Sequence, residues 1–211
     1  MGASTLGREH RPGGKGESAE RRAQIASLLP LLLCLFLPLS CASPLSYIHP
    51  TADLTYIKTI AVVPLKNLTQ ERGAEGKAMN VIAAEVLRRG VFDVVEFGEV
   101  AKVLREEGFN EEEGVISKNI ALRAGKRLDA QAFIVGSVEE YGVSRAGGSS
   151  YPEVSLSLKL VDANSYKILW EATHSVKGTT LLDRLFGISK KSPGDLCKEV
   201  VTEMFDTLFG G

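Results

Sequence analysis

The amino-acid sequence predicts an α/β fold: a single domain with a five-stranded mixed sheet and helices packed on it. Strand-like and helix-like segments alternate in the first half of the body, whereas three strand-like segments follow one another in the second half and an amphipathic helix ends the chain. This order, β-α-β-α-α-β-β-β-α, is typical of a mixed sheet covered by helices. Because only short links join the last three strands, we expect an antiparallel C-terminal meander.

The first strand is expected at Ile57–Pro64, a β-rich run that is apolar on both faces, as central strands are. A polar loop follows, and Lys77–Arg89 then places its apolar residues on one helical face. Gly90 stands where a glycine commonly ends a helix. These residues predict the first strand–helix unit.

A second strand is expected at Val91–Phe97, and a short helix between Val100 and Gly108. Ser117 can cap a third helix, because its hydroxyl can accept a hydrogen bond from a free N–H of the first turn. The small residues on the inner face of this helix predict close packing on the sheet: Ile120, Ala121, Ala124, Gly125 and Leu128.

The last three strands are expected at Ala132–Tyr141, Glu153–Asp162 and Lys167–Val176, the second of which alternates strictly between apolar and polar residues. A final helix should begin after Ser192, because Pro193 suits the first helical position. Its apolar stripe consists of Leu196, Cys197, Val200, Val201, Met204, Phe205 and Leu208.

Residues 1–40 are predicted to be a signal peptide of the lipoprotein type. Arg21 and Arg22 precede a dense apolar core at 28–39, which is the order of an export signal. The core is too short to span a bilayer, which takes about 20 residues, and two prolines interrupt it. We therefore expect export and not a membrane-spanning helix.

Ser40-Cys41 follows the apolar core and resembles the lipobox of bacterial lipoproteins, in which a small residue precedes the acylated cysteine. We predict lipidation of Cys41, with palmitate among the acyl chains, a tether at 41–53 and an α/β envelope domain at 54–211. Acyl chains contribute about 0.8 kcal/mol per buried CH₂ to membrane binding. Two alternatives stay open: ordinary cleavage after Ala42, which would release a soluble periplasmic protein, and a Cys41 that is only one more apolar residue.

No catalytic, cofactor or metal site can be assembled from the sequence, so we predict no enzyme and no cofactor. A phosphate-binding loop would need glycine at Glu71 and serine or threonine at Ala78. Cys197 lies in an apolar helix stripe, where a thiol is usually inert. The formal net charge of −1 gives no reason to expect nucleic acid.

Four phrases, in this order, resemble successive strands of one group of envelope lipoproteins: Ile60–Asn67, Gly90–Glu96, Asp129–Gly136 and Leu160–Trp170. The group is the superfamily of curli-secretion, TolB amino-terminal-like and penicillin-binding-protein-activator lipoproteins, and the likeness is nearest to its uncharacterised putative lipoproteins. Tyr166 stands where the last phrase usually has glycine.

The resemblance implies a membrane-tethered periplasmic lipoprotein that acts as a non-catalytic protein-binding or assembly module of the cell envelope. The membrane would be contacted through lipid on Cys41, and the unidentified protein partner could be a peptidoglycan synthase or an export complex. By resemblance to the Gram-negative sorting rule, Ala42 after the cysteine favours the inner leaflet of the outer membrane, facing the periplasm.

The alternative function is that of an oligomeric subunit of an outer-membrane secretion channel of the curli-secretion type, and the resemblance leaves a homo-oligomer open in either case. Two loops are candidate contact surfaces. Gly142–Tyr151 is rich in glycine and serine. The large apolar residues of Lys177–Pro193 are expected to form a helical turn that covers the sheet, with an exposed docking patch as the alternative. The first loop, at ten residues, is too short to form the long amphipathic hairpin that a channel subunit would need.

Overall fold

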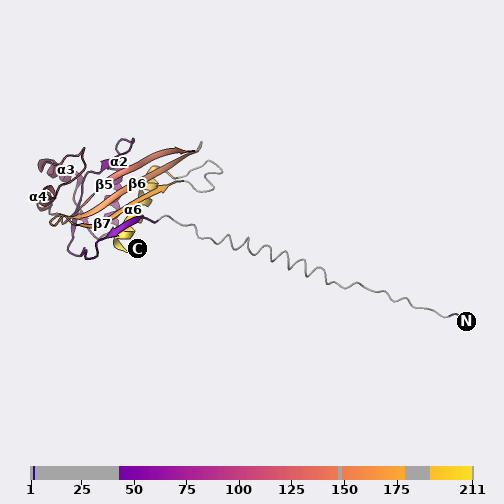
Figure 1. Cartoon of the computed structure of the whole chain (residues 1–211), viewed down its shortest axis with the longest axis horizontal. Coiled ribbons are helices and arrows are strands. Elements are labelled where there is room, and N and C mark those ends of the chain that lie inside the picture. The colour runs from indigo at the N-terminus through magenta and orange to yellow at the C-terminus, as the bar shows by residue number, and fades with distance from the viewer. Residues whose placement is uncertain (1, 3–42, 147–148, 179–190, 211) are drawn as a thin grey trace. The chain divides into compact units, whose positions relative to one another are not determined.

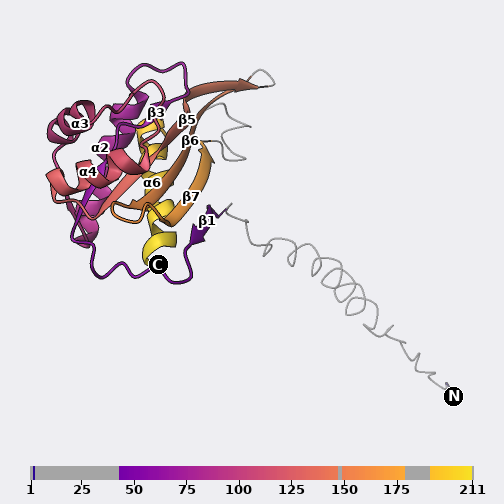
Figure 2. The same cartoon turned by 60° about the vertical axis from the view of Figure 1, so that its left-hand side comes forward.

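A computed structural model describes residue 2 and residues 43–146, 149–178 and 191–210. The chain divides into two compact units, Met1–Ala42 and Ser43–Gly211. Apart from residue 2, the first unit lies outside the described residues, and with it Cys41 and the predicted signal peptide. Figures 1 and 2 show the second unit as a long twisted sheet with helices against it.

Seven strands form one mixed sheet, so the predicted fold class is confirmed with two strands more than expected. The spatial order is β1-β7-β6-β5-β2-β4, and β3 pairs with β5. β2 runs parallel to β4 and β5, whereas β5, β6, β7 and β1 are antiparallel neighbours. The strands are β1 (Leu45–Ile48), β2 (Thr59–Val62), β3 (Lys66–Asn67), β4 (Asp93–Val94), β5 (Ala132–Ala146), β6 (Ser149–Asp162) and β7 (Ile168–Lys177).

The additional strands lie in segments that carry little strand pattern of their own. β1 falls in the stretch assigned to the tether, and it adds to the sheet edge by pairing Leu45 with Thr173 and Ile48 with Trp170. β3 falls in the polar loop after the first strand and is only two residues long. The strand expected at Val91–Phe97 is likewise reduced to β4. Strands this short are stabilised by the ladder of a neighbour and not by their own alternation.

In the described part of the chain, four helices pack on the two faces of the sheet: α2 (Ala74–Arg89), α3 (Phe97–Glu106), α4 (Lys118–Leu128) and α6 (Pro193–Phe209). The expected caps are present. Ser117 accepts a hydrogen bond from the amide of Ile120 at the start of α4, and Ser192 and Asp195 form a reciprocal capping box at the start of α6. Within the described residues no helix is long and apolar enough to cross a membrane.

The larger hydrophobic core lies between α2, α6 and one face of the sheet. Apolar side chains of β6 and β7 meet the stripe of α6 there, and the ring of Trp170 lies 5.5 Å from that of Phe205. The indole Nε1 of Trp170 donates to Thr207 Oγ1 at 3.0 Å, which satisfies its polar group inside the core.

The opposite face of the sheet is covered over only part of its width. α3 and α4 pack on Ala61, Val63 and Phe133, which belong to β2 and β5 or directly follow them. Figure 2 shows these helices at the β2 side, away from β7 and β1. Nothing in the described residues covers the remainder of this face, which we call the open face. It consists of the side chains of Val135, Ser137, Ser157, Lys159, Val161, Ile168, Glu171 and Thr173.

The interpretation of Gly142–Tyr151 as a loop is wrong, because β5 and β6 continue through it as a paired hairpin. Val143 lies opposite Pro152 and Arg145 opposite Ser150, and the strands run to Ala146 and from Ser149. Figure 1 shows this hairpin reaching past the helices. Glycine and serine suggested a loop, but backbone hydrogen bonds between strands do not depend on the side chains.

Candidate functional site

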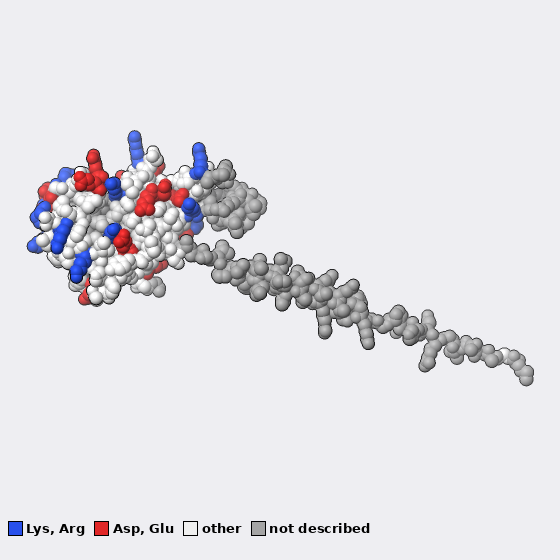
Figure 3. Space-filling model, viewed as in Figure 1, with Lys and Arg blue, Asp and Glu red and all other residues white. Residues whose placement is uncertain are grey.

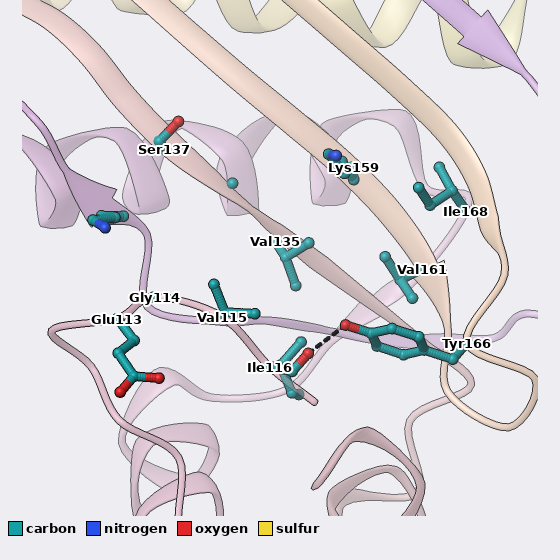
Figure 4. A pocket seen from close by; sticks show the side chains of 12 residues that line it. Glu113, Gly114, Val115, Ile116, Val135, Ser137, Lys159, Val161, Tyr166 and Ile168 are labelled. Atoms are coloured by element: carbon teal, nitrogen blue, oxygen red, sulfur yellow. Dashed lines mark hydrogen bonds between the residues drawn. The ribbon is translucent and has the colours of Figure 1, made fainter. Parts of the chain in front are cut away.

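A cleft of about 390 Å³ lies where the covered part of the second sheet face meets the open face (Figure 4). Its floor is formed by strands β5, β6 and β7, with the apolar side chains of Val135, Val161 and Ile168. One wall is the loop between α3 and α4, represented by Val115 and Ile116. Val161 is 4% exposed and Val135 packs against the core that includes α3 and α4, whereas Ile168 is half-buried, so the apolar floor lies at the border of the helix-covered part.

Tyr166 closes the end of the cleft from the turn between β6 and β7. Its backbone is in the left-handed region, with φ of +62°, which costs a non-glycine residue about 1–2 kcal/mol. The phenol hydroxyl donates a hydrogen bond to the carbonyl oxygen of Ile116, and the ring packs against the smaller hydrophobic core. These two contacts offset the strain, and they tie the wall loop to the sheet.

Asp162 holds the same turn in place. Its Oδ1 accepts hydrogen bonds from the amide and the hydroxyl of Ser165 at 2.6 and 2.5 Å, and its Oδ2 accepts one from the Tyr56 hydroxyl at 2.6 Å. Burial acts to raise the pKa of Asp162, but these hydrogen bonds outweigh burial and hold the pKa below its ordinary value. Burial, together with the bond to Asp162, raises the pKa of Tyr56.

Two residues before Ile116, the wall loop makes a second close contact, with β3. Gly114 has φ of +63°, and a Cβ built there would lie 2.8 Å from the Cβ of Lys66. Asn110 holds the loop internally, because its Nδ2 donates to Glu113 Oε1 at 3.2 Å and its Oδ1 accepts from the Glu112 amide at 3.0 Å. A glycine is therefore required at this point of the wall.

Two lysines and one glutamate surround the cleft. The Lys159 ammonium lies 3.1 Å from Glu171 Oε1 on the open face, whereas the Lys66 ammonium has no ion-pair partner among the described residues. Glu113 already accepts from Asn110. On the face seen in Figure 3, basic and acidic side chains are interspersed, so that face carries no large patch of one sign.

The groups weighed for chemistry in the sequence lie away from the cleft. Cys197 is buried in the larger core, and burial raises the pKa of its thiol to about 12, so it stays protonated near neutral pH. His174 is buried on the helix-covered face with Nε2 2.5 Å from Glu203 Oε2 of α6. In the part of the chain that the structure describes, no histidine or cysteine lines the cleft, and no three metal-ligating side chains form a group. The arrangement is suited to binding.

The structure describes only some of the predicted site residues. Cys41 lies outside the described residues, as do residues 179–190 of the predicted Lys177–Pro193 contact loop. Sequence reasoning did not find the cleft. The signal that could have indicated it is Tyr166 in a turn that usually has glycine, because a large residue at a strained position implies a compensating contact.

Residues 41–176 match the family model described as the peptidoglycan-synthase activator LpoB. No curated protein sequence matches the chain. Among solved structures, a PelC dodecamer from Paraburkholderia phytofirmans is similar with a TM-score of 0.53 and 18% identity, over 79% of this chain and 96% of that one. Lipoprotein GNA1162 from Neisseria meningitidis is similar with a TM-score of 0.53 and 21% identity, over 73% and 99%. These two likenesses show a shared fold.

Proposed function

The chain belongs to the peptidoglycan-synthase activator LpoB family, and from this premise we propose that it is a lipid-anchored envelope protein that binds a protein partner and catalyses no reaction. The membership confirms the resemblance to the superfamily of curli-secretion and penicillin-binding-protein-activator lipoproteins. The observation that carries the proposal is the extent of the match, which starts at Cys41 and runs to Val176, through every strand of the sheet.

We infer that the partner is a peptidoglycan synthase, because the family is described by activation of that enzyme. Among the residues that the structure describes, the open face and its cleft are the part of the sheet available for a partner, since α2 and α6 occupy the other face. An export complex remains the competing partner. The protein acts on the periplasmic side of the outer membrane, where the acylated Cys41 holds the domain against the inner leaflet.

The activator role is tested by polymerisation of lipid-linked precursor by a bifunctional peptidoglycan synthase from the same organism, with and without the purified protein. We expect the protein to accelerate glycan synthesis at micromolar concentration and to have no polymerising activity alone. An unchanged rate, with binding to the synthase also absent, would reject the synthase as partner. Recovery of an export complex on the tethered protein would then favour the competitor.

The anchor is tested by metabolic labelling with an alkyne analogue of palmitate. Cys41→Ala should abolish the label, because the cysteine thiol is the acylated group. Cys34→Ala, inside the predicted signal peptide, is the matched control and should keep the label at the wild-type level. Equal labelling of wild type and Cys41→Ala would rule out the anchor, and a mature protein that starts at Ser43 would establish ordinary cleavage.

A second candidate is the oligomeric subunit of an outer-membrane secretion channel of the curli-secretion type. One observation favours it: the PelC structure that shares this fold is a dodecamer. Light scattering of the protein purified in detergent distinguishes the two candidates. A ring of many copies supports the channel subunit, whereas the mass of one chain, unchanged on dilution, favours the tethered binding module.

A further inference from the structure

The floor of the cleft is an apolar surface at the border between the helix-covered part of this sheet face and the open face. Val135, Val161 and Ile168 come from three neighbouring strands and gather on one face, as Figure 4 shows. Val115, at the rim, is 67% exposed. At about 390 Å³ the space lies within the range of ligand pockets, about 300–1,000 Å³. An apolar side chain would gain free energy by leaving water for this floor.

The walls of the cleft are held before any ligand arrives. The Tyr166 hydroxyl donates to the carbonyl of Ile116, and Gly114 lies against Lys66, so the part of the wall loop that leads into α4 is held at two points. Tyr166 keeps a left-handed backbone to do so, and non-glycine residues in such conformations concentrate at ligand clamps and other functional sites. A preformed wall spares the ligand the entropic cost of ordering it.

The lysine side chains at the rim favour a ligand that carries a negative charge. Lys66 has no ion-pair partner in the described part of the chain, and Lys159 can turn from Glu171 because both side chains are more than one-third exposed. Glu113, the acid at the rim, keeps its negative charge, but Figure 4 shows its carboxylate turned away from the apolar floor, and Asn110 donates to it at 3.2 Å. A carboxylate beside an apolar group would thus meet two ammonium groups that can turn toward it. Exposed pairs are worth little, so we expect the apolar group to supply affinity and the carboxylate to supply preference.

The surroundings of the cleft favour a peptide over a small acid. The open face continues from the cleft across hydroxyl groups, with Ser157 Oγ and Thr173 Oγ1 3.0 Å apart. Beyond them lie Leu45 and Tyr47 of β1, which are 81% and 47% exposed. A surface of this length, polar in the middle and apolar at both ends, can contact several residues of an extended chain.

We propose that the cleft is the anchor site for an extended segment of the partner protein, and that it takes one aliphatic or aromatic side chain with an aspartate or glutamate next to it. This inference rests on the proposed function in one respect only, that the partner is a protein. It adds the place of binding and the chemistry of the segment that binds.

The test uses fluorescence anisotropy of labelled heptapeptides with the full protein, purified from membranes in detergent. The first peptide has a central leucine between two aspartates. In the second, lysines replace the aspartates, and in the third, serine replaces the leucine. We expect the first to bind at least about tenfold more tightly than the third, as burial of a leucine side chain implies, and more tightly than the second.

Lys66→Glu should reverse the preference between the first two peptides, and Val115→Glu should weaken the first. The matched control is Lys126→Glu on the exposed side of α4, which should leave binding unchanged. Lys66, Val115 and Lys126 are exposed, so the variants should fold, as thermal unfolding will show. The proposal is wrong if the three peptides bind alike, if Lys126→Glu acts as Lys66→Glu does, or if hexanoate competes at the concentration of the peptide.

The two proposals fail separately. If peptides bind as expected but no synthase is activated, the cleft is supported as a peptide-binding site and the synthase is not the partner. Suppose instead that wild type and Lys66→Glu activate the synthase equally and that the three peptides bind alike. The activator role is then supported, and the partner binds elsewhere.

Discussion

At the turn between β6 and β7, Tyr166 occupies a left-handed backbone conformation and donates its hydroxyl to Ile116. Tyr166→Phe should remove that bond and leave a carbonyl without a partner, which costs about 1 kcal/mol. For a domain of this size we expect a loss of about 2–4 °C in Tm by calorimetry. Tyr47→Phe, on the half-exposed edge strand, is the control and should change Tm little. Equal shifts would mean that the bond contributes nothing.

The lowered pKa of Asp162 links stability to pH. The folded state favours the ionised carboxylate, so its contribution is present above the unfolded pKa of about 3.9 and is lost as pH falls through the lower folded value. In Asp162→Asn, the free energy of unfolding should therefore fall less steeply between about pH 4 and pH 2 than in the wild type, as measured by urea unfolding. Asp93→Asn, at an exposed site, should follow the wild-type curve. A wild-type slope in Asp162→Asn would contradict this account.

At the scale of the element, the long β5–β6 hairpin depends on a close approach of its strands at Gly136. A Cβ there would lie 2.0 Å from the carbonyl oxygen of Ser157 and 3.0 Å from Leu158 Cδ2. Because backbone cannot yield as a flexible side chain can, Gly136→Ala should force the strands apart.

We expect Gly136→Ala to cost about 1–3 kcal/mol of unfolding free energy, as overpacked cores do. Gly76→Ala in α2 is the control, and we expect it to raise the free energy of unfolding. Nothing lies within 4 Å of its Cβ position, and alanine is the better helix former by up to about 1 kcal/mol. Denaturant unfolding of both variants checks the pair, and a stable Gly136→Ala protein would show that the strands can separate without loss.

The helices illustrate which elements local sequence can determine. Ser117 and Ser192 cap α4 and α6 as expected, because a cap is a contact between residues three positions apart. Strand ends are different. β5 and β6 extend beyond their expected limits at Tyr141 and Glu153 because each pairs with the other, and that pairing is not visible in either segment alone.

At the scale of the whole molecule, a sheet with one covered and one half-covered face presents a surface for a partner. Lys159 and Glu171 pair across the open face at 3.1 Å. Lys159→Glu should place two acids opposite each other and weaken the proposed activation of a synthase, with a stability cost below about 1 kcal/mol.

The double variant Lys159→Glu with Glu171→Lys is the matched control for that change. It restores a pair of opposite charges, so stability should return to the wild-type value, whereas the charge pattern presented to a partner stays reversed. We expect activation to remain impaired, as measured by glycan polymerisation. Full recovery of activation in the double variant would show that Lys159 acts through stability and not through recognition.

Patterns within one segment determined the fold class, the helices of the described residues, the central strands and the antiparallel meander, since periodicity, caps and turn residues act over a few positions. The place of lipidation, Cys41, stays a prediction of that kind. The pairing of β1, the continued hairpin and the cleft were decided by tertiary structure. Each depends on backbone groups or side chains that come together from distant parts of the chain, as Tyr166 and Ile116 do. No local pattern determines which part of a sheet its helices leave uncovered.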